Sequence, residues 1–297
     1  MANTISKGSL FPPELIPGMI SEVRGASALA QLSGQAPIAF TGQTEFIFSM
    51  DNDVAIVAEG AKKPAQAATV TAKTIQPLKV VYTMRITDEF MTASEDFQMA
   101  LRENFGAGFA RKLARGLDLM AIHGVNPFDG TAAAAIGTNC FDKADGIQKM
   151  TRDAKKDMDA TIEDAIALVQ GADYDVTGIA MAPAVRSELA AITNNGAKIY
   201  PQLAWGSAPG MINGLPVQVN STVANKGLDL FVAGDFATNF KWGYAKQIPI
   251  EVIQYGDPDN TGVDLKGSNQ VALRGEAYMG WTIFQPEAFA LCASADA

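Results

Sequence analysis

The stretch from Thr44 to His123 constrains the fold of this chain most, because it places a long two-stranded β-ribbon directly before a long amphipathic helix. The residues whose spacing predicts the ribbon are Phe46, Phe48, Ala55 to Ala58, Val80, Tyr82 and Met84. Such a ribbon with a polar tip has too little apolar surface to fold back on its own core, so a neighbouring subunit is the simplest partner for its unpaired edges. This feature predicts an assembly protein before it predicts an enzyme.

The predicted tip of the ribbon is polar and carries three lysines, Lys62, Lys63 and Lys73. Lysines on an exposed strand edge discourage random strand pairing. They can also meet acidic groups of an adjoining subunit, where charge pairs fix register more than they add affinity. Both interpretations keep the lysines at the surface, and we expect them and Glu59 to lie at a contact between subunits.

The helix after the ribbon has a start signal and one apolar face. Thr92-Ala-Ser-Glu95 has the spacing of a capping box, in which a hydroxyl and a carboxylate each accept from a free backbone N–H of the first turn. Apolar residues then recur every four positions, and we expect them to form the buried core face of the helix: Phe97, Leu101, Phe105, Phe109, Leu113 and Leu117.

The remaining segments predict an extended arm and a mixture of short helices and strands. Residues 1–36 alternate short apolar groups with Pro and Gly, with one short helix expected near 14–22. Helices are predicted over 161–170, closed by Gly171 in a left-handed backbone, and over 184–192. Strands are predicted in GIAMAP, GLPVQVNS, LDLFVAGDF, around Ile248 to Val252, around Val271 to Leu273 and after Pro286.

Composition and charge exclude several classes of protein. With 297 residues, 48% of them apolar, the chain is long enough to bury one large core or two smaller ones. Its 23 basic and 32 acidic residues give a net charge of −9, which equips it poorly for neutralising nucleic-acid phosphates. We find no signal-peptide pattern and no apolar run of bilayer length, and we expect Cys140 and Cys292 to be reduced thiols.

No segment matches a known catalytic or metal-binding pattern. His123 is the sole histidine, and its place at the end of the long helix predicts a structural role there. A single histidine and two cysteines far apart in sequence are too few to form the common zinc ligand sets. Gly106-Ala-Gly108 imitates a dinucleotide fingerprint, but it lies inside a helix and Arg111 replaces the third glycine, so we expect a packing role.

The segment from Asp257 to Asp264 resembles a calcium loop only in its first positions. Thr261 stands at the fifth position and Ser268 at the twelfth, where a bidentate glutamate is needed, so we expect a solvated acidic turn. The sequence therefore predicts no catalytic residue, no cofactor site and no metal site.

The order of several short segments resembles the major capsid proteins of tailed bacteriophages, which share the HK-ninety-seven-like fold. Each segment is weak alone, and the specificity lies in their common order and gaps over nearly the whole chain. The segments are ELIPGMISEVRGASAL, VAEGAKKP, KVVYTMRITDEFM, GLDLMAIHG, MAPAVRSELAAI, GLPVQVNS, FVAGDF and FQPEAFALCA.

The resemblance implies an α+β fold whose domains are discontinuous in sequence. Residues 1–36 would be an N-terminal arm, 37–81 the extended β-hairpin loop with its flanking strands, and 82–125 a peripheral domain with a long spine helix. Residues 126–235 would form an axial α/β domain, 236–286 the remaining peripheral strands, and 287–297 a C-terminal strand returning to the axial domain.

The resemblance also implies a structural, non-enzymatic function. The chain would assemble with itself through pentamers and hexamers into an icosahedral shell around double-stranded DNA, which it would contact without sequence specificity. The implied partners are a separate scaffolding protein and a portal, with no membrane, and the implied location is the virion capsid, assembled in the bacterial cytoplasm.

Three alternatives stay open at the level of sequence. An encapsulin-type compartment would have the same fold and enclose an enzyme. A soluble α/β enzyme would use the acidic loop near Asp257 and form a small oligomer with turnover. A tail or decoration protein would bind a finished shell and form no closed particle alone.

Overall fold

The computed structural model describes residues 27–50, 52–92, 94–224 and 229–295, without the side chains of Phe97 and residues 247–249. The helix expected near 14–22 and most of the N-terminal arm lie outside these residues. The helices are α2 (Ala28–Leu32), α3 (Glu95–His123), α4 (Met158–Gly171) and α5 (Pro183–Ala191), with 3₁₀ turns η1 (Asp88–Thr92), η2 (Pro201–Gly206), η3 (Lys266–Ser268) and η4 (Pro286–Ala288).

The strands form a hairpin, two sheets and a two-residue ladder. The hairpin pairs β1 (Gln43–Met50) with β2 (Ala68–Ile75), and the ladder pairs β6 (Thr193–Asn194) with β7 (Ala197–Lys198). The three-stranded sheet has the order β11 (Phe240–Ile253), β12 (Gln270–Ile283) and β3 (Leu78–Thr87). The six-stranded sheet has the order β4 (Gln148–Thr151), β13 (Phe289–Ala293), β10 (Asp229–Gly234), β5 (Gly178–Met181), β9 (Leu215–Val219) and β8 (Met211–Ile212).

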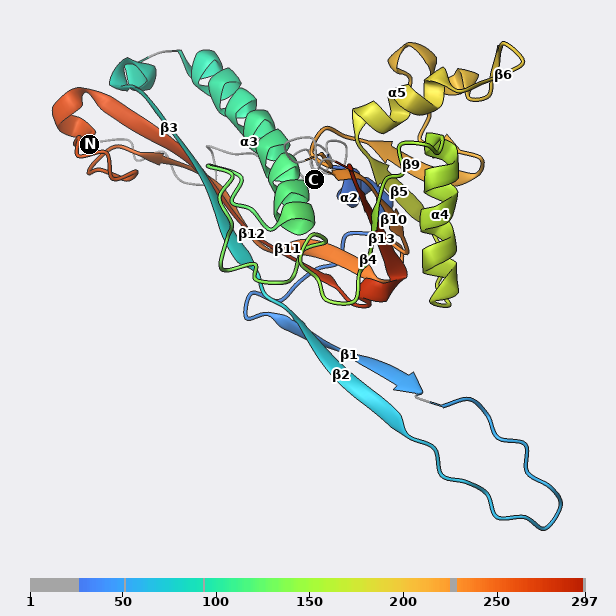
Figure 1. Ribbon diagram of the computed structural model, residues 1–297. Coiled ribbons are helices and arrows are strands. Elements are labelled where there is room, and N and C mark those ends of the chain that lie inside the picture. The colour runs from blue at the N-terminus through green and yellow to red at the C-terminus, as the bar shows by residue number, and fades with distance from the viewer. Residues whose placement is uncertain (1–26, 51, 93, 225–228, 296–297) are drawn as a thin grey trace.

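These elements form an α+β body from which the hairpin projects. Helix α3 runs beside the three-stranded sheet, and α4 and α5 lie beside the six-stranded sheet, while β1 and β2 extend away from both (Figure 1). The six-stranded sheet is buried on both faces: Ala180 and Val232 join the core cluster that contains α3, whereas Ile179 and Phe231 join the cluster that contains α4 and α5. Strands buried on two faces carry the continuous apolar runs seen in β5 and β10.

The second strand of the hairpin is not the one that the sequence pattern indicates. The return strand is β2, and Ala55 to Ala58 lie in irregular backbone. Val80, Tyr82 and Met84 belong to β3, where they pair along β12. Strand β3 forms backbone hydrogen bonds along its whole length with β12, a largely buried strand, and the hairpin offers no such partner. The alternating pattern therefore predicted a strand correctly, but the partner assigned to that strand was wrong.

Helix α3 spans 29 residues and carries its buried face toward the sheet. Phe105, Phe109, Leu113 and Leu117 are buried and Leu101 is half-buried, while the side chain of Phe97 is outside the described part. The capping box was wrong: Thr92 ends η1 and donates its hydroxyl to the carbonyl of Glu89, and α3 begins only at Glu95. The turn before the helix therefore takes up the hydroxyl that was expected to cap it.

The two shorter helices form close to where the pattern places them. The first, α4, ends at Gly171, but this glycine has no left-handed backbone; Asp173 does, with φ of 62°. An aspartate tolerates this conformation because its short polar side chain bonds locally. The other core cluster, which contains α3, includes four aromatic rings whose neighbouring centroids lie 5.0 to 6.4 Å apart: Phe141, Phe236, Phe240 and Phe289.

A glycine in β11 allows the segment after α2 to lie against the sheet. The amide of Ala36 donates to the carbonyl of Trp242 at 2.9 Å, and a Cβ at Gly243 would stand 1.7 Å from the carbonyl oxygen of Ala36. Only a residue without a side chain permits this approach.

We expect Gly243→Ala to lower the free energy of unfolding by about 1–3 kcal/mol, because the segment around Ala36 must move off the sheet. Chemical denaturation of the unassembled chain measures this loss. Gly34→Ala is the matched control, since a Cβ at Gly34 meets nothing within 4 Å. Equal stability of the two variants would contradict the close approach.

Candidate assembly surface and buried polar centre

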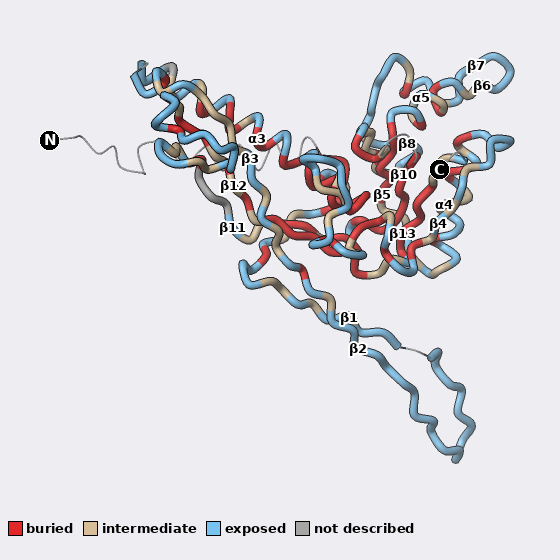
Figure 2. Tube along the Cα trace, turned by 60° about the vertical axis from the view of Figure 1, so that its left-hand side comes forward, coloured by how far each residue is buried: buried red, intermediate tan, exposed pale blue. Residues whose placement is uncertain are grey.

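One face of the hairpin is apolar and bare. The antiparallel register places Phe46 opposite Ala72, Phe48 opposite Val70 and Met50 opposite Ala68, so these side chains share a face. Phe46 is 73% exposed, Phe48 60% and Met50 77%. Figure 2 shows the hairpin almost entirely in the colour of exposed residues. Apolar side chains gathered on one exposed face mark an interaction surface. We call this set, Phe46, Phe48, Met50, Val70 and the alanines opposite, the apolar hairpin face.

The root of the hairpin is fixed to the body. Ile75 is buried against Ile38 and Phe284, and the Nζ of Lys241 lies 2.7 Å from a carboxylate oxygen of Glu45. This anchoring gives the ribbon a defined direction although the described residues of its outer part are exposed.

The lysines expected at the tip lie at two different places. Glu59, Lys62 and Lys63 are exposed in the loop beyond the strands, next to the fully exposed Ile56. Lys73 is half-buried near the root, opposite Glu45 in the register, so its assignment to the tip was wrong. The return strand is β2 itself, which shifts Lys73 from the tip to the base.

The acidic loop after β11 is closed by an arginine. The guanidinium of Arg85 contacts carboxylate oxygens of Asp257 and Asp259 and also donates to Thr261 and to the carbonyl of Val263. This neighbouring charge lowers the pKa of Asp259 to about 2. The turn is therefore not simply solvated, because Arg85 occupies the oxygens that a calcium ion or a reaction would require.

A buried carboxylate, Asp118 on α3, joins three segments of the chain. It accepts from the hydroxyl of Ser27, from the amides of Ala28 and Leu29 at 3.0 and 3.3 Å, and from the hydroxyl of Thr222 at 2.7 Å. Burial raises the pKa of this carboxyl, and the four donated hydrogen bonds oppose that rise. The start of α2 is thereby tied to the middle of the core.

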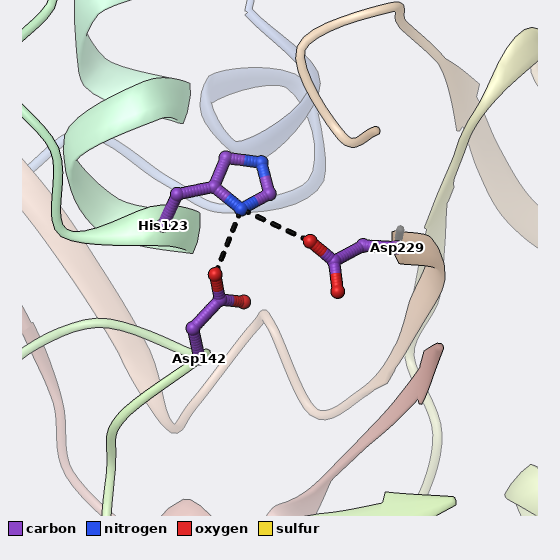
Figure 3. Close-up of side chains that lie close together, drawn as sticks. All are labelled: His123, Asp142 and Asp229. Atoms are coloured by element: carbon purple, nitrogen blue, oxygen red, sulfur yellow. Dashed lines mark hydrogen bonds and ion pairs between the residues drawn. The ribbon is translucent and has the colours of Figure 1, made fainter. Parts of the chain in front are cut away.

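One turn further along α3, His123 is the centre of a second polar cluster. Its Nδ1 lies 2.9 Å from Oδ2 of Asp142 and 3.2 Å from Oδ2 of Asp229 (Figure 3). Its Nε2 lies 2.9 Å from the carbonyl oxygen of Thr222. The side chain of His123 is 0% exposed. His123 was expected to have a role at the helix end, and neither aspartate was predicted to contact it, because both stand far from it in sequence.

The His123 cluster predicts a loss of stability in alkaline solution. Burial lowers the pKa of His123, but the hydrogen bonds from its ring to Asp142 and Asp229 outweigh burial and raise the pKa from 6.5 to about 9. Because the folded pKa is the higher one, this contribution is complete below about pH 6.5 and is lost as the pH rises through about 9.

We expect the free energy of unfolding to fall by at most about 3 kcal/mol between pH 6.5 and about 9. The measurement includes a chelator, so that no metal ion competes with the proton on His123. His123→Gln should show a flatter profile between pH 6.5 and 9. A wild-type profile as flat as that of the variant would contradict the charged imidazole.

The other residues singled out by the sequence have structural surroundings. Cys140 and Cys292 are buried free thiols, and burial raises the pKa of both. A Cβ at Gly106 would touch Ile250 at 3.4 Å, which fits close packing, whereas one at Gly108 would meet nothing within 4 Å. Among the described residues, no helix combines the length and apolar character required to cross a membrane.

A ribbon anchored at its root, with one exposed apolar face and carried on a body of two sheets, is typical of a structural subunit. The comparisons with known proteins agree with this class. The sequence profile of the phage capsid family matches residues 7–293, and the chain belongs to this family. No match was found among curated proteins.

Solved structures from phages and from a GTA particle have the same fold. A chain from Mycobacterium phage Ogopogo is 29% identical with a TM-score of 0.79, and the alignment covers 91% of this chain and 92% of that one. A chain from Gordonia phage Cozz is 23% identical with a TM-score of 0.74, covering 90% and 86%. A structure described as the capsid of an empty GTA particle computed with C5 symmetry is 17% identical with a TM-score of 0.64, covering 91% and 90%. The expected α+β capsid fold and the structural capsid role are confirmed.

Proposed function

We propose that this chain builds a closed icosahedral shell by placing its hairpin across the next copy. The observation that supports the proposal most is the apolar hairpin face, which is exposed in the single chain although its root is firmly anchored. Burying a phenylalanine side chain stabilises a contact by roughly 1.5–3 kcal/mol, so a neighbour that covers Phe46 and Phe48 supplies a large part of one subunit contact.

Each segment of the chain has its own role in this assembly. Residues 1–36 act as the arm and 37–81 as the extended loop, while α3 with the three-stranded sheet forms the peripheral domain. The six-stranded sheet with α4 and α5 forms the axial domain, around which five or six copies close into rings. Head-to-tail contacts that close by rotation generate such rings, and many weak contacts acting together stabilise the shell.

The proposed contents and partners follow from the same assembly. The shell encloses double-stranded DNA without reading its sequence, in keeping with the net charge of −9. It assembles in the bacterial cytoplasm with a separate scaffolding protein and a portal, and it carries out no catalysis. Glu59, Lys62 and Lys63 are exposed and free to meet charges of a neighbour, and Lys73 contributes from the root of the hairpin.

Electron microscopy of the purified full chain, expressed with and without a scaffolding protein, tests the proposal. Closed shells of many subunits support it, and DNA in particles from infected cells separates a capsid from a compartment that encloses an enzyme. A chain that stays a monomer or dimer under both conditions, or that binds only to finished shells, contradicts it.

A further inference from the structure

The tautomer of His123 is set by its surroundings. Nε2 faces the carbonyl oxygen of Thr222 at 2.9 Å, and because a carbonyl only accepts, Nε2 carries a proton and donates it. Nδ1 is then the nitrogen that faces the two carboxylates, at 2.9 and 3.2 Å. A histidine whose second nitrogen donates to a backbone carbonyl has the orientation that metal-binding histidines usually have.

The charges at this point require a cation. A bare lone pair on Nδ1 would face the lone pairs of two carboxylate oxygens, which is repulsive, so either a proton or a metal ion must lie between them. A proton gives one imidazolium against two carboxylates and leaves one negative charge in excess. A divalent ion bound to the neutral imidazole and the same carboxylates leaves none. Water screens the excess charge only in part, because the side chain of Asp142 is 27% exposed and that of Asp229 is 11% exposed.

Asp142 provides a second, independent sign that the cluster is incomplete. Its Oδ1 is buried and has no hydrogen-bond partner among the described residues. Lys149 does not supply a donor to this oxygen, because its Nζ donates to the backbone carbonyl of Asp142. Buried carboxylate oxygens without a donor are uncommon in folded proteins, and a bound cation satisfies such an oxygen.

We propose that His123 Nδ1, Asp142 and Asp229 bind one divalent transition-metal ion of the Zn²⁺ class. The three ligand atoms lie within 4.8 Å of one another. Zinc bonds to imidazole nitrogen and carboxylate oxygen measure about 2.0–2.2 Å, so ligand atoms at tetrahedral angles stand about 3.4 Å apart. Nδ1 and the two carboxylate oxygens, which lie 2.9 and 3.2 Å from it, need to separate by only a few tenths of an ångström to reach that spacing.

The ligand set also selects the kind of ion. Calcium and magnesium prefer ligands that are all oxygen, whereas an imidazole with two carboxylates suits zinc, manganese or cobalt. The ion would join the end of α3, the loop that carries Asp142 and the start of β10, so its role is structural. The site could not be predicted from the sequence, because its ligands are separated by 19 residues, from 123 to 142, and by 87 residues, from 142 to 229.

Zinc binding to the chelator-treated, purified full chain tests the proposal. We expect about one Zn²⁺ per chain by elemental analysis after dialysis and a rise of the melting temperature with added Zn²⁺. Co²⁺ should show the visible absorption bands of a tetrahedral site, a signature that does not depend on stability. Asp229→Asn and Asp142→Asn should each weaken zinc binding by at least about tenfold.

Asp145→Asn is the matched control, because Asp145 lies in the same loop as Asp142 and is exposed. It should bind zinc as the wild type does. Circular dichroism shows whether each variant is folded before binding is measured. Absence of bound zinc in the wild type, or binding that Asp142→Asn and Asp229→Asn leave unchanged, overturns the proposal and leaves an imidazolium held by two carboxylates.

Discussion

Phe46→Thr combined with Phe48→Thr is expected to abolish shell assembly and to leave the folded subunit intact. Both rings are exposed in the single chain, so their removal should change its free energy of unfolding by no more than about 0.5 kcal/mol. In a shell each buried ring contributes roughly 1.5–3 kcal/mol, and the loss recurs at every contact. Threonine preserves the strand, because β-branched residues favour extended backbone. Sedimentation and electron microscopy measure assembly, and thermal melting measures the subunit.

The opposite face of the same hairpin supplies the control for this experiment. Thr69 and Thr71 pair with Ser49 and Ile47, on the face without the phenylalanines. Thr69→Ser with Thr71→Ser should form shells at the wild-type level. If the phenylalanine variant assembled normally, or if it unfolded while the control did not, the apolar hairpin face would belong to the core of its own subunit and the assembly role would be refuted.

Asp118→Ala is expected to destabilise the subunit by about 3–5 kcal/mol, the largest single-residue effect that we expect. The substitution removes the acceptor of two backbone amides, those of Ala28 and Leu29, and of the hydroxyls of Ser27 and Thr222. Each buried donor left without a partner costs about 1–3 kcal/mol, and rotating hydroxyls can recover part of that cost whereas amides cannot. Chemical denaturation of the unassembled chain measures the change.

Asp118→Asn separates the hydrogen bonds from the space that the side chain fills. Asparagine has nearly the same shape and keeps one carbonyl oxygen, so it should restore part of the stability lost in Asp118→Ala. A loss below about 1 kcal/mol in Asp118→Ala would show that water replaces the carboxylate, and that the start of α2 is not held by it.

The regular elements of the fold were predictable because their signals are local. The four-residue spacing of Phe105, Phe109 and Leu113 reports a helix with one buried face, and the continuous apolar runs of β5 and β10 report strands buried on both sides. Pairing was harder, since Val80 and Tyr82 alternate in the same way whether their partner is the hairpin or β12. Only the tertiary structure decides between two partners.

The polar centre had weaker signals in the sequence. Asp118 interrupts the apolar run LDLMAI, and a carboxylate in such a run on a buried helix is the one local mark that a buried acceptor leaves. Asp229 interrupts the apolar run LDLFV in the same way, but neither it nor Asp142 could be paired with His123, because the three residues meet only in the folded chain. Clusters assembled from distant segments escape any argument from spacing.

The strands β2 and β3 are separated only by Gln76 and Pro77, and they run almost end to end (Figure 1). Strand β2 has 8 residues and is therefore about 26 Å long at roughly 3.3 Å per residue. A bend of ~10° just beyond the anchored Ile75 would move the far end of this strand by ~4 Å while the body and the root stayed still. Identical copies could then tile both the flat and the sharply curved regions of a polyhedron by adjusting a single joint.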